Sequence, residues 1–391
     1  MVRASYGQNG AVTRIGIVAV LSTAVACIVG VHAQTVSRGR STSPPLEMRV
    51  TFEPTAFPSA NHTYLFYELH IRNAGSAPAA LRRIEVLDAA QATREPLAAV
   101  EAEQLDEILQ PFGAQIVTDA SNDHRELMAG GSVVAFMSIA LDRGTPVPDK
   151  LLHRVVAADF NVEGAVIDTH HTELHVLRPP VEGTNWGAFD GPGNDSDNHH
   201  RRGILIMGAR PVISRRYAID WKQVESGATL AGDARDKNAY FAYGKTVLAV
   251  ADGRVITARD GLPDNVPGHN DAFHPAVPIT METVAGNTVT LDIGGRQFVY
   301  YCHLQPGSVR VKVGDRVRRG QLLARVGNSG DAREPHLHIE VTTDPRFAAG
   351  EGVPYLIDNY RVMAGDNGRT GPRTRELPLN GMLVDFGSRA K

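Results

Sequence analysis

The stretch Pro335-His-Leu-His-Ile-Glu-Val341 decides the fold of the C-terminal half of this chain. Its composition predicts a β-strand over residues 336–341, in which successive side chains point to opposite faces. His336 and His338 then share one face, with their Cα atoms about 6.6 Å apart at ~3.3 Å per residue. Two imidazoles on one face suit either two metal ligands or one ligand beside one acid/base group.

The sequence on either side of this strand shows the same pattern of short strands, without a helical period of any length. We expect further strands at residues 203–207, 217–221, 246–251, 255–257, 288–293, 298–302, 310–313 and 321–326. The C-terminal half is therefore predicted to be an all-β domain.

Two more side chains in these strands point to chemistry. Asp220 lies in the apolar stretch Ala218-Ile-Asp-Trp221, and a buried carboxylate needs a partner. Zinc is one candidate partner, and the neighbouring Arg215 or Arg216 is another. His303 ends a predicted strand in Tyr300-Tyr-Cys-His-Leu-Gln-Pro-Gly307, just before a turn.

Several motifs occur in a fixed order along the same region. They are Thr246-Val-Leu-Ala-Val-Ala-Asp-Gly253, Gly286-Asn-Thr-Val-Thr-Leu-Asp-Ile293, Val311-Lys-Val-Gly-Asp-Arg-Val-Arg-Arg-Gly320, Gly327-Asn-Ser-Gly330 and Pro335-His-Leu-His338. Together they resemble the lysostaphin/LytM-type zinc metallopeptidases, which cleave peptide bonds in peptidoglycan. The resemblance implies a β-rich domain of the duplicated hybrid motif kind, Zn2+ as the cofactor and peptidoglycan peptides as the substrate.

The resemblance also implies a role for each of four residues. Asp220 and His338 match the family's zinc ligands, and His336 and His303 match its general acid/base pair. The chemistry is consistent, because zinc lowers the pKa of a coordinated water to about 7 and an imidazole can take that proton.

One position departs from the family. The usual His-x-Gly-x-Asp pattern is Arg216-Tyr-Ala-Ile-Asp220 in this chain, and a guanidinium has no lone pair for a metal. Either the site is inactive or another histidine replaces the missing ligand. The stretch Asn198-His-His-Arg-Arg202 is the expected donor, with His200 favoured slightly over His199, although the same residues would also suit a solvated basic turn.

Other residues near these motifs receive simpler interpretations. Arg216 would share a strand face with Asp220, so we expect it to pair with a carboxylate or to stabilise the oxyanion. Cys302 is expected to be a small buried core residue, because strand alternation turns its side chain away from His303. His269 and His274 lie in a Pro- and Asn-rich loop, where exposed and substrate-rim roles both stay open.

The N-terminal half contains strands of its own. Alternation at residues 48–52, 64–72 and 133–141 predicts an Ig-like β-sandwich over residues 46–178. The histidines at positions 170, 171 and 175 favour a solvated strand edge over a metal site. Arg178-Pro-Pro-Val181 marks a boundary, after which we place the metallopeptidase-like domain at 179–364 and a mobile tail at 365–391.

The first residues carry a targeting pattern. Arg3 and Arg14 precede an uncharged apolar stretch at 15–31 and then Val31-His-Ala33, which predicts a signal peptide over residues 1–33 followed by a linker at 34–45. An uncleaved N-terminal membrane anchor is the alternative, and lipidation at Cys27 is a weaker one. We therefore expect an exported protein, periplasmic or secreted, without stable membrane insertion after cleavage.

The composition of the chain argues against a nucleic-acid-binding function and against a disulfide-stabilised fold. The chain of 391 residues has 40 Lys and Arg against 43 Asp and Glu, a net charge of −3, which gives no long-range attraction for nucleic acid. Cleavage would leave only Cys302, so no intramolecular disulfide is expected.

Two functions stay open: a zinc metalloendopeptidase, or an inactive cell-wall-binding or hydrolase-regulating domain on the same fold. The pair His303 and His336 favours the enzyme, because a binding domain has no need of two imidazoles facing a carboxylate.

Overall fold

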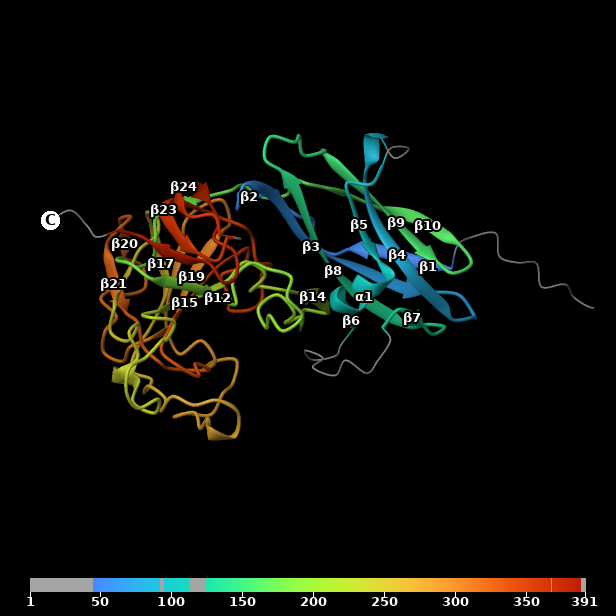
Figure 1. Ribbon diagram of the computed structural model, residues 1–391. Helices are drawn as coiled ribbons and strands as arrows, with labels where there is room; N and C mark the ends of the chain where they lie inside the picture. The colour runs from blue at the N-terminus through green and yellow to red at the C-terminus, as the bar shows by residue number, and fades with distance from the viewer. Residues whose placement is uncertain (1–44, 92–94, 113–123, 367, 388–391) are drawn as a thin grey trace, which may run out of the picture. The chain divides into compact units, whose positions relative to one another are not determined.

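The computed structural model describes residues 45–91, 95–112, 124–366 and 368–387, which form mainly β-strands (Figure 1). This confirms the predicted all-β class. The helical elements of the described ranges are short: α1 (Ala102–Ile108) and the 3-10 turns η1 (Ala89–Gln91), η2 (Lys237–Ala239) and η3 (Asn270–Ala272). None of the described helices is long and apolar enough to cross a membrane. The predicted signal peptide and nearly all of the predicted linker lie outside the described residues.

The N-terminal part contains two antiparallel five-stranded sheets. The first has the order β1-β3-β8-β6 with β2 beside β3, and the second has the order β10-β9-β4-β5 with β7 beside β4. The strands of the first sheet are β1 (Leu46–Val50), β2 (Phe57–Ser59), β3 (His62–Asn73), β6 (Leu109–Pro111) and β8 (Ser132–Asp142). Those of the second are β4 (Ala79–Asp88), β5 (Ala98–Glu101), β7 (Glu126–Leu127), β9 (Lys150–Ala157) and β10 (Asn161–Asp168). Two sheets agree with the predicted sandwich, whereas the Ig-like topology stays a prediction.

Strand β3 is buried on both of its faces. Leu65, Tyr67 and Leu69 belong to the apolar core that the two sheets share, while Phe66 and Glu68 on the other face are also buried. Strand β8 is likewise buried on both faces over residues 133–137. The outer face of the first sheet is therefore covered by other parts of the chain, which include Arg201, next to His200 in sequence.

The C-terminal part contains an eleven-stranded sheet in the order β11-β23-β25-β12-β15-β22-β19-β18-β17-β20, with β24 beside β23. Its strands are β11 (Val176–Leu177), β12 (Trp186–Phe189), β15 (Ile219–Gln223), β17 (Gly253–Arg259), β18 (Asn287–Asp292), β19 (Phe298–Leu304), β20 (Arg316–Val317), β22 (Leu337–Thr342), β23 (Leu356–Ala364), β24 (Gly371–Glu376) and β25 (Leu383–Asp385). Two hairpin-like pairs complete the domain: β13 (Leu205–Met207) with β14 (Arg210–Val212), and β16 (Thr246–Leu248) with β21 (Leu322–Arg325).

Three sequence expectations change in this part. The strand predicted at 310–313 does not form, and β20 follows it instead. The segment after residue 364 is no free tail, because β24 and β25 pair with β23. The C-terminal sheet also includes β11, which lies just before the boundary that we placed after residue 178.

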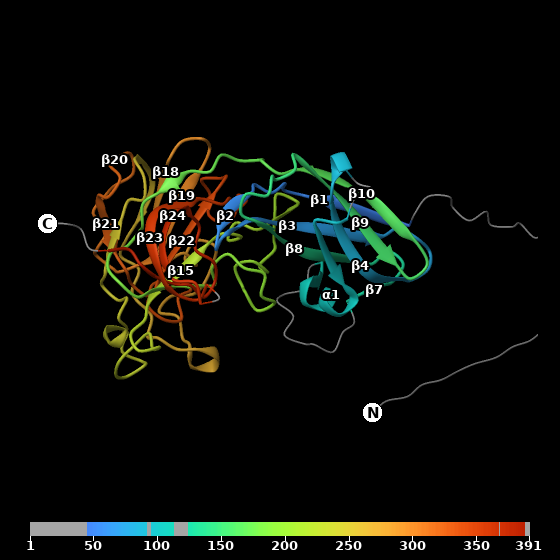
Figure 2. The same ribbon diagram turned by 45° about the horizontal axis from the view of Figure 1, so that its top comes forward.

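The centre of this sheet positions the candidate site. Strands β15, β22 and β19 run side by side (Figure 2), with Asp220 opposite His338 and His338 opposite Cys302 in the antiparallel ladder. Residues opposite one another in neighbouring strands point to the same face of the sheet. The neighbouring positions, among them Ile219 and Ile339, point into the apolar core that fills the other side.

Candidate metal centre and active site

Asp220 is the centre of the candidate site. Its carboxylate is buried, and among the described residues its charged partners are three imidazoles. His338 Nδ1 lies 2.8 Å from Oδ1, His200 Nε2 lies 3.6 Å from Oδ1, and His336 Nε2 lies 3.4 Å from Oδ2. The alternative of a salt bridge from Asp220 to Arg215 or Arg216 is therefore wrong.

His200 reaches Asp220 from the loop before β13. Its Nδ1 donates to the carbonyl oxygen of Asp190 at 2.8 Å, so the neutral ring presents the lone pair of Nε2 toward Asp220. A lone pair facing a buried carboxylate oxygen is unfavourable unless a proton or cation lies between them. This arrangement fits a divalent metal, with His200, Asp220 and His338 as the residues that would hold it.

His199 is a second candidate beside the same carboxylate. The ligand atoms of His199, His200 and Asp220 all lie within 4.8 Å of one another. His199 Nδ1, however, pairs with Asp190 Oδ1 at 3.0 Å, and its side chain is 44% exposed against 2% for His200. We favour His200 with Asp220 and His338, because burial and the free Nε2 lone pair both suit a ligand.

The second ring nitrogen of His338 faces another carboxylate. His338 Nε2 lies 3.5 Å from Glu340 Oε2, and Glu340 is completely buried without a hydrogen bond to either carboxylate oxygen in the described part of the chain. Carboxylates often orient a metal-ligating histidine in this way. Sequence reasoning missed Glu340, although alternation along Pro335-His-Leu-His-Ile-Glu-Val341 places it on the face of His338.

His336 and His303 form a pair of imidazoles beside this centre, with ring centroids 4.8 Å apart. His336 Nδ1 donates to the carbonyl oxygen of Glu334 at 2.7 Å, and His303 Nδ1 donates to that of Ser329 at 2.8 Å. Both rings are thereby held with Nε2 unprotonated. Each Nε2 is then available to accept a proton.

The surroundings shift the pKa values of these groups in different directions. Burial lowers the pKa of His336, and it lowers the pKa values of His200 and His303 well below the usual range. Burial opposes the ionised form of Asp220 too, but the imidazoles of His336, His200 and His338 hold its pKa well below the usual value. For His338, burial disfavours the charged ring, but the neighbouring carboxylates of Asp220 and Glu340 outweigh it and raise the pKa to about 9.

His303 owes its position to an unusual backbone. Its φ of 61° lies in the left-handed region, which interrupts the alternation of β19. As a result Cys302 and His303 both line the same cavity, so the expectation that Cys302 turns away from His303 is wrong. Cys302 is nevertheless a buried free thiol, as expected.

The cavity at this site has a volume of about 270 Å3. Its walls include basic groups such as Arg215, Lys222 and Arg333, together with the histidine and aspartate side chains described above: Asp190, His199, His200, Asp220, His303, His336 and His338. His269 also lines it, whereas His274 does not. The structure therefore brings together all five predicted site residues: His200, Asp220, His303, His336 and His338.

Arg216 does not line this cavity. Its guanidinium is buried and pairs with Glu68 at 2.6 Å and with Glu351 at 2.8 Å. Of the two roles expected for Arg216, carboxylate pairing is observed and the oxyanion role is wrong, because the residue precedes β15 and does not follow its alternation.

The histidines at 171 and 175 lie apart from this centre. His171 Nδ1 is 3.5 Å from Glu53 and His175 Nε2 is 4.0 Å from Glu173. No regular strand of the described chain spans 171–175, so these rings do not share a strand face. Their surroundings give no sign of a metal cluster in the described residues.

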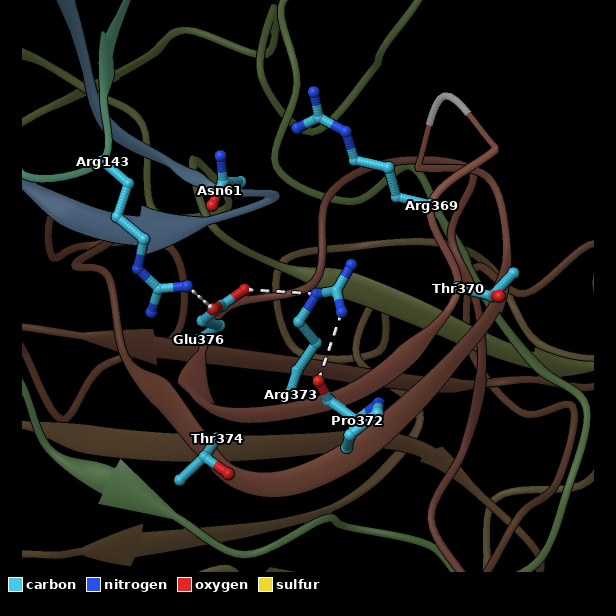
Figure 3. Close-up of a pocket in the computed structure, with 8 residues that line it drawn as sticks. All are labelled: Asn61, Arg143, Arg369, Thr370, Pro372, Arg373, Thr374 and Glu376. Atoms are coloured by element: carbon cyan, nitrogen blue, oxygen red, sulfur yellow. Dashed lines mark hydrogen bonds and ion pairs between the residues drawn. The ribbon is translucent and has the colours of Figure 1, made fainter.

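A larger pocket of about 590 Å3 lies elsewhere and is lined by arginines. Figure 3 shows Arg143 and Arg373 both directed at Glu376, which is buried. The distances are 3.2 Å from Arg143 Nη1 and 3.6 Å from Arg373 Nε. Arg373 also pairs with Asp366 at 2.8 Å, so the two arginines face two carboxylates. The described lining of this pocket contains no acid/base pair of the kind found around Asp220.

Comparison with known proteins identifies the domain around this site. Residues 238–349 match the sequence profile of peptidase family M23, which confirms the resemblance to the lysostaphin/LytM-type metallopeptidases over this part of the chain. The match contains His303, His336 and His338, whereas His200 and Asp220 lie before it. Zinc is the cofactor of this family, in agreement with the histidine and aspartate cluster of the structure.

Solved structures give weaker likenesses. The catalytic domain of lysostaphin from Staphylococcus simulans is 20% identical, with 41% of this chain and 80% of that chain covered and a TM-score of 0.22. A zinc-containing peptidase from Vibrio cholerae is 16% identical, with 80% of this chain and 85% of that chain covered and a TM-score of 0.23. No curated protein sequence matches the chain.

Proposed function

We propose that this protein is an exported zinc metalloendopeptidase that hydrolyses peptide bonds in peptidoglycan, in cross-links or stem peptides. The observation that carries the proposal is the convergence of His200, Asp220 and His338 with the pair His303 and His336 on one cavity. The match to peptidase family M23 supports the reaction class. Export rests on the apolar segment and Val31-His-Ala33 of the N-terminal sequence.

The three proposed ligands account for a metal site in which the usual upstream histidine is Arg216. Catalytic zinc ordinarily has three protein ligands and an open position. His200 supplies the third ligand from a loop, so the substitution at position 216 does not by itself inactivate the site. A zinc ion held there would act as a Lewis acid and lower the pKa of a coordinated water.

His336 and His303 would move the protons. Their Nδ1 atoms are fixed on backbone carbonyls, and burial keeps the rings neutral, so each Nε2 can accept a proton and return it to a leaving amine. Their two rings lie side by side at the cavity wall, one from β19 and one from the residue before β22. Peptide hydrolysis needs a group that activates water and a group that transfers protons. The metal site would supply the first and the two imidazoles the second.

The proposal is tested by digestion of purified peptidoglycan with the protein lacking residues 1–33. We expect new amino termini and smaller muropeptides, with loss of both after zinc removal and recovery after zinc is returned. His336→Ala serves as the matched inactive control. Zinc-loaded wild-type protein that binds peptidoglycan without releasing any product would instead support the inactive cell-wall-binding or hydrolase-regulating function.

A further inference from the structure

The segment that carries His200 is held in place by its own turn. Asn198 Oδ1 accepts the backbone N–H groups of His200 at 3.1 Å and of Arg201 at 2.9 Å. Asn198 Nδ2 in turn donates to the carbonyl oxygen of Gly191 at 2.8 Å. Together with the bond from His200 Nδ1 to the carbonyl oxygen of Asp190, they attach the turn to residues 190 and 191, directly after β12, whose Phe189 lies opposite Asp220 in the sheet.

Arg201, the next residue, fastens the turn to the first sheet of the sandwich. Its side chain is 1% exposed and forms an ion pair with Glu68 of β3. Its Nη2 also donates to the carbonyl oxygens of Tyr67 at 3.0 Å and Met137 at 3.2 Å. The guanidinium lies 5.0 Å from the ring centroid of Phe136 in β8, so strands β3 and β8 both contact it.

Arg202 fastens the same turn to α1. Its Nη2 donates to the carbonyl oxygen of Glu107 at 3.0 Å, near the end of the helix, and to that of Asn194 at 2.6 Å. Its guanidinium stacks 4.3 Å from the centroid of Phe136. Both arginines are buried, so the alternative of a solvated basic turn is wrong.

We infer that Arg201 and Glu68 are positioning residues for the metal site, and that the N-terminal sandwich thereby completes a site built on the C-terminal sheet. The inference rests on the proposed function. Where the upstream ligand lies four residues before the aspartate, the two share a local backbone. His200 lies in a loop twenty residues before Asp220, so its place depends on contacts that the loop makes elsewhere. Hydrogen bonds to Asp190 and Gly191 attach the turn to the end of β12, and the buried pair of Arg201 with Glu68, adjacent to His200 in sequence, adds an attachment to the sandwich.

The test measures the zinc dissociation constant of the full mature chain by competition with a chromophoric chelator, beside thermal unfolding of each metal-free protein. Arg201→Met removes the guanidinium while Glu68 keeps its pair with Arg216. We expect zinc affinity to fall by about 10- to 100-fold, as for other groups that orient a ligand. Arg201→Lys keeps the positive charge but loses the branched guanidinium. Its zinc affinity is expected to lie between those of Arg201→Met and the wild type.

Glu351→Gln is the matched control. Glu351 pairs with Arg216 in the same buried charge cluster, and no hydrogen bond or ion pair joins it to residues 198–202 in the described structure. It is expected to change thermal stability without changing zinc affinity. If Arg201 contributes to stability alone, Arg201→Met will also change thermal stability and leave zinc affinity unchanged.

The outcomes separate this inference from the proposed function. Wild-type protein that binds no zinc would overturn both. Zinc binding that His200→Ala weakens and that folded Arg201→Met leaves within twofold of wild type would overturn only the positioning role. If Arg201→Met does not fold, Arg201→Lys decides in the same way, with unchanged affinity as the contradicting result.

Discussion

His336 and His338 lie two residues apart and face one cavity, but their ring nitrogens make different contacts. His338 Nδ1 contacts the buried carboxylate of Asp220 directly, at 2.8 Å. His336 Nδ1 instead donates to the carbonyl oxygen of Glu334 at 2.7 Å, and its Nε2 lies farther from the same carboxylate, 3.4 Å from Asp220 Oδ2. In the proposed function, His338 is a zinc ligand and His336 belongs to the acid/base pair.

This difference gives a prediction at the level of two single substitutions. His336→Ala should keep its zinc and lose turnover by ~10²–10⁴-fold, which is typical of a lost acid/base group. His338→Ala should lose the zinc itself. Zinc analysis beside the rate of muropeptide release checks both, and equal zinc loss in the two proteins would contradict the assignment.

Glu340 is expected to orient the ring of His338. A buried carboxylate without hydrogen bonds destabilises the fold unless a charged partner compensates it. We predict that Glu340→Gln, which keeps the size of the side chain, weakens zinc binding by about 10- to 100-fold. Its free energy of unfolding in the metal-free state should not fall, since the substitution removes a buried charge. Urea unfolding and chelator competition measure the two quantities.

For Glu340→Gln we therefore expect weaker zinc binding without a lower free energy of unfolding in the metal-free state. Zinc affinity equal to that of the wild type would show that Glu340 does not orient His338.

At the scale of elements, the turn Gly327-Asn-Ser-Gly330 determines where His303 sits. Ser329 accepts the hydrogen bond from His303 Nδ1, and Gly330 has a φ of +74° with almost no space around it. A Cβ at Gly330 would lie 2.3 Å from Gly286 N and 2.6 Å from the carbonyl oxygen of Val284. The close approach of these two backbone segments requires glycine.

Gly330→Ala is therefore predicted to cost clearly more than the ~1 kcal/mol of a left-handed alanine. Gly314→Ala is the matched control, because Gly314 has a φ of +95° and nothing within 4 Å of an added Cβ. The difference between the two free energies of unfolding, measured in urea, isolates the steric contribution. Equal costs for the two substitutions would mean that the turn can move aside.

Strand alternation predicted the elements well where the backbone is regular. The patterns at residues 64–72, 133–141 and 336–341 correspond to β3, β8 and β22 within one or two residues. Alternation failed at His303, since a left-handed φ is invisible in the pattern and brings the side chain of His303 to the same cavity as that of Cys302. It also gave no hint that β3 is buried on both faces, because Glu68 and His70 look like solvent-facing residues in sequence.

At the scale of the whole molecule, the candidate site depends on contacts between residues far apart in the chain. Resemblance to a family indicated Asp220, His303, His336 and His338, and elimination at Arg216 indicated the loop histidines. Neither could indicate Glu68, whose connection to the site runs through Arg201, 133 residues later in the sequence. Ion pairs of this kind leave no periodic signal, so only the structure reveals them.

The metal should also contribute to the stability of the whole fold. A ligand that binds only the native state stabilises it by about 2.7 kcal/mol at a free concentration of 100 times its Kd. We predict that chelation lowers the Tm of the mature protein and that added zinc restores it. His338→Ala should show the same Tm with zinc and with chelator, and a zinc-independent Tm in the wild type would contradict the site.

The central claim, that His200 replaces the ligand lost at Arg216, is tested most directly by the zinc content of four purified mature proteins: the wild type and three single variants. We predict one zinc ion per chain in the wild type and in His199→Ala, and loss of zinc in His200→Ala as severe as in His338→Ala. Full zinc occupancy in His200→Ala would contradict the claim.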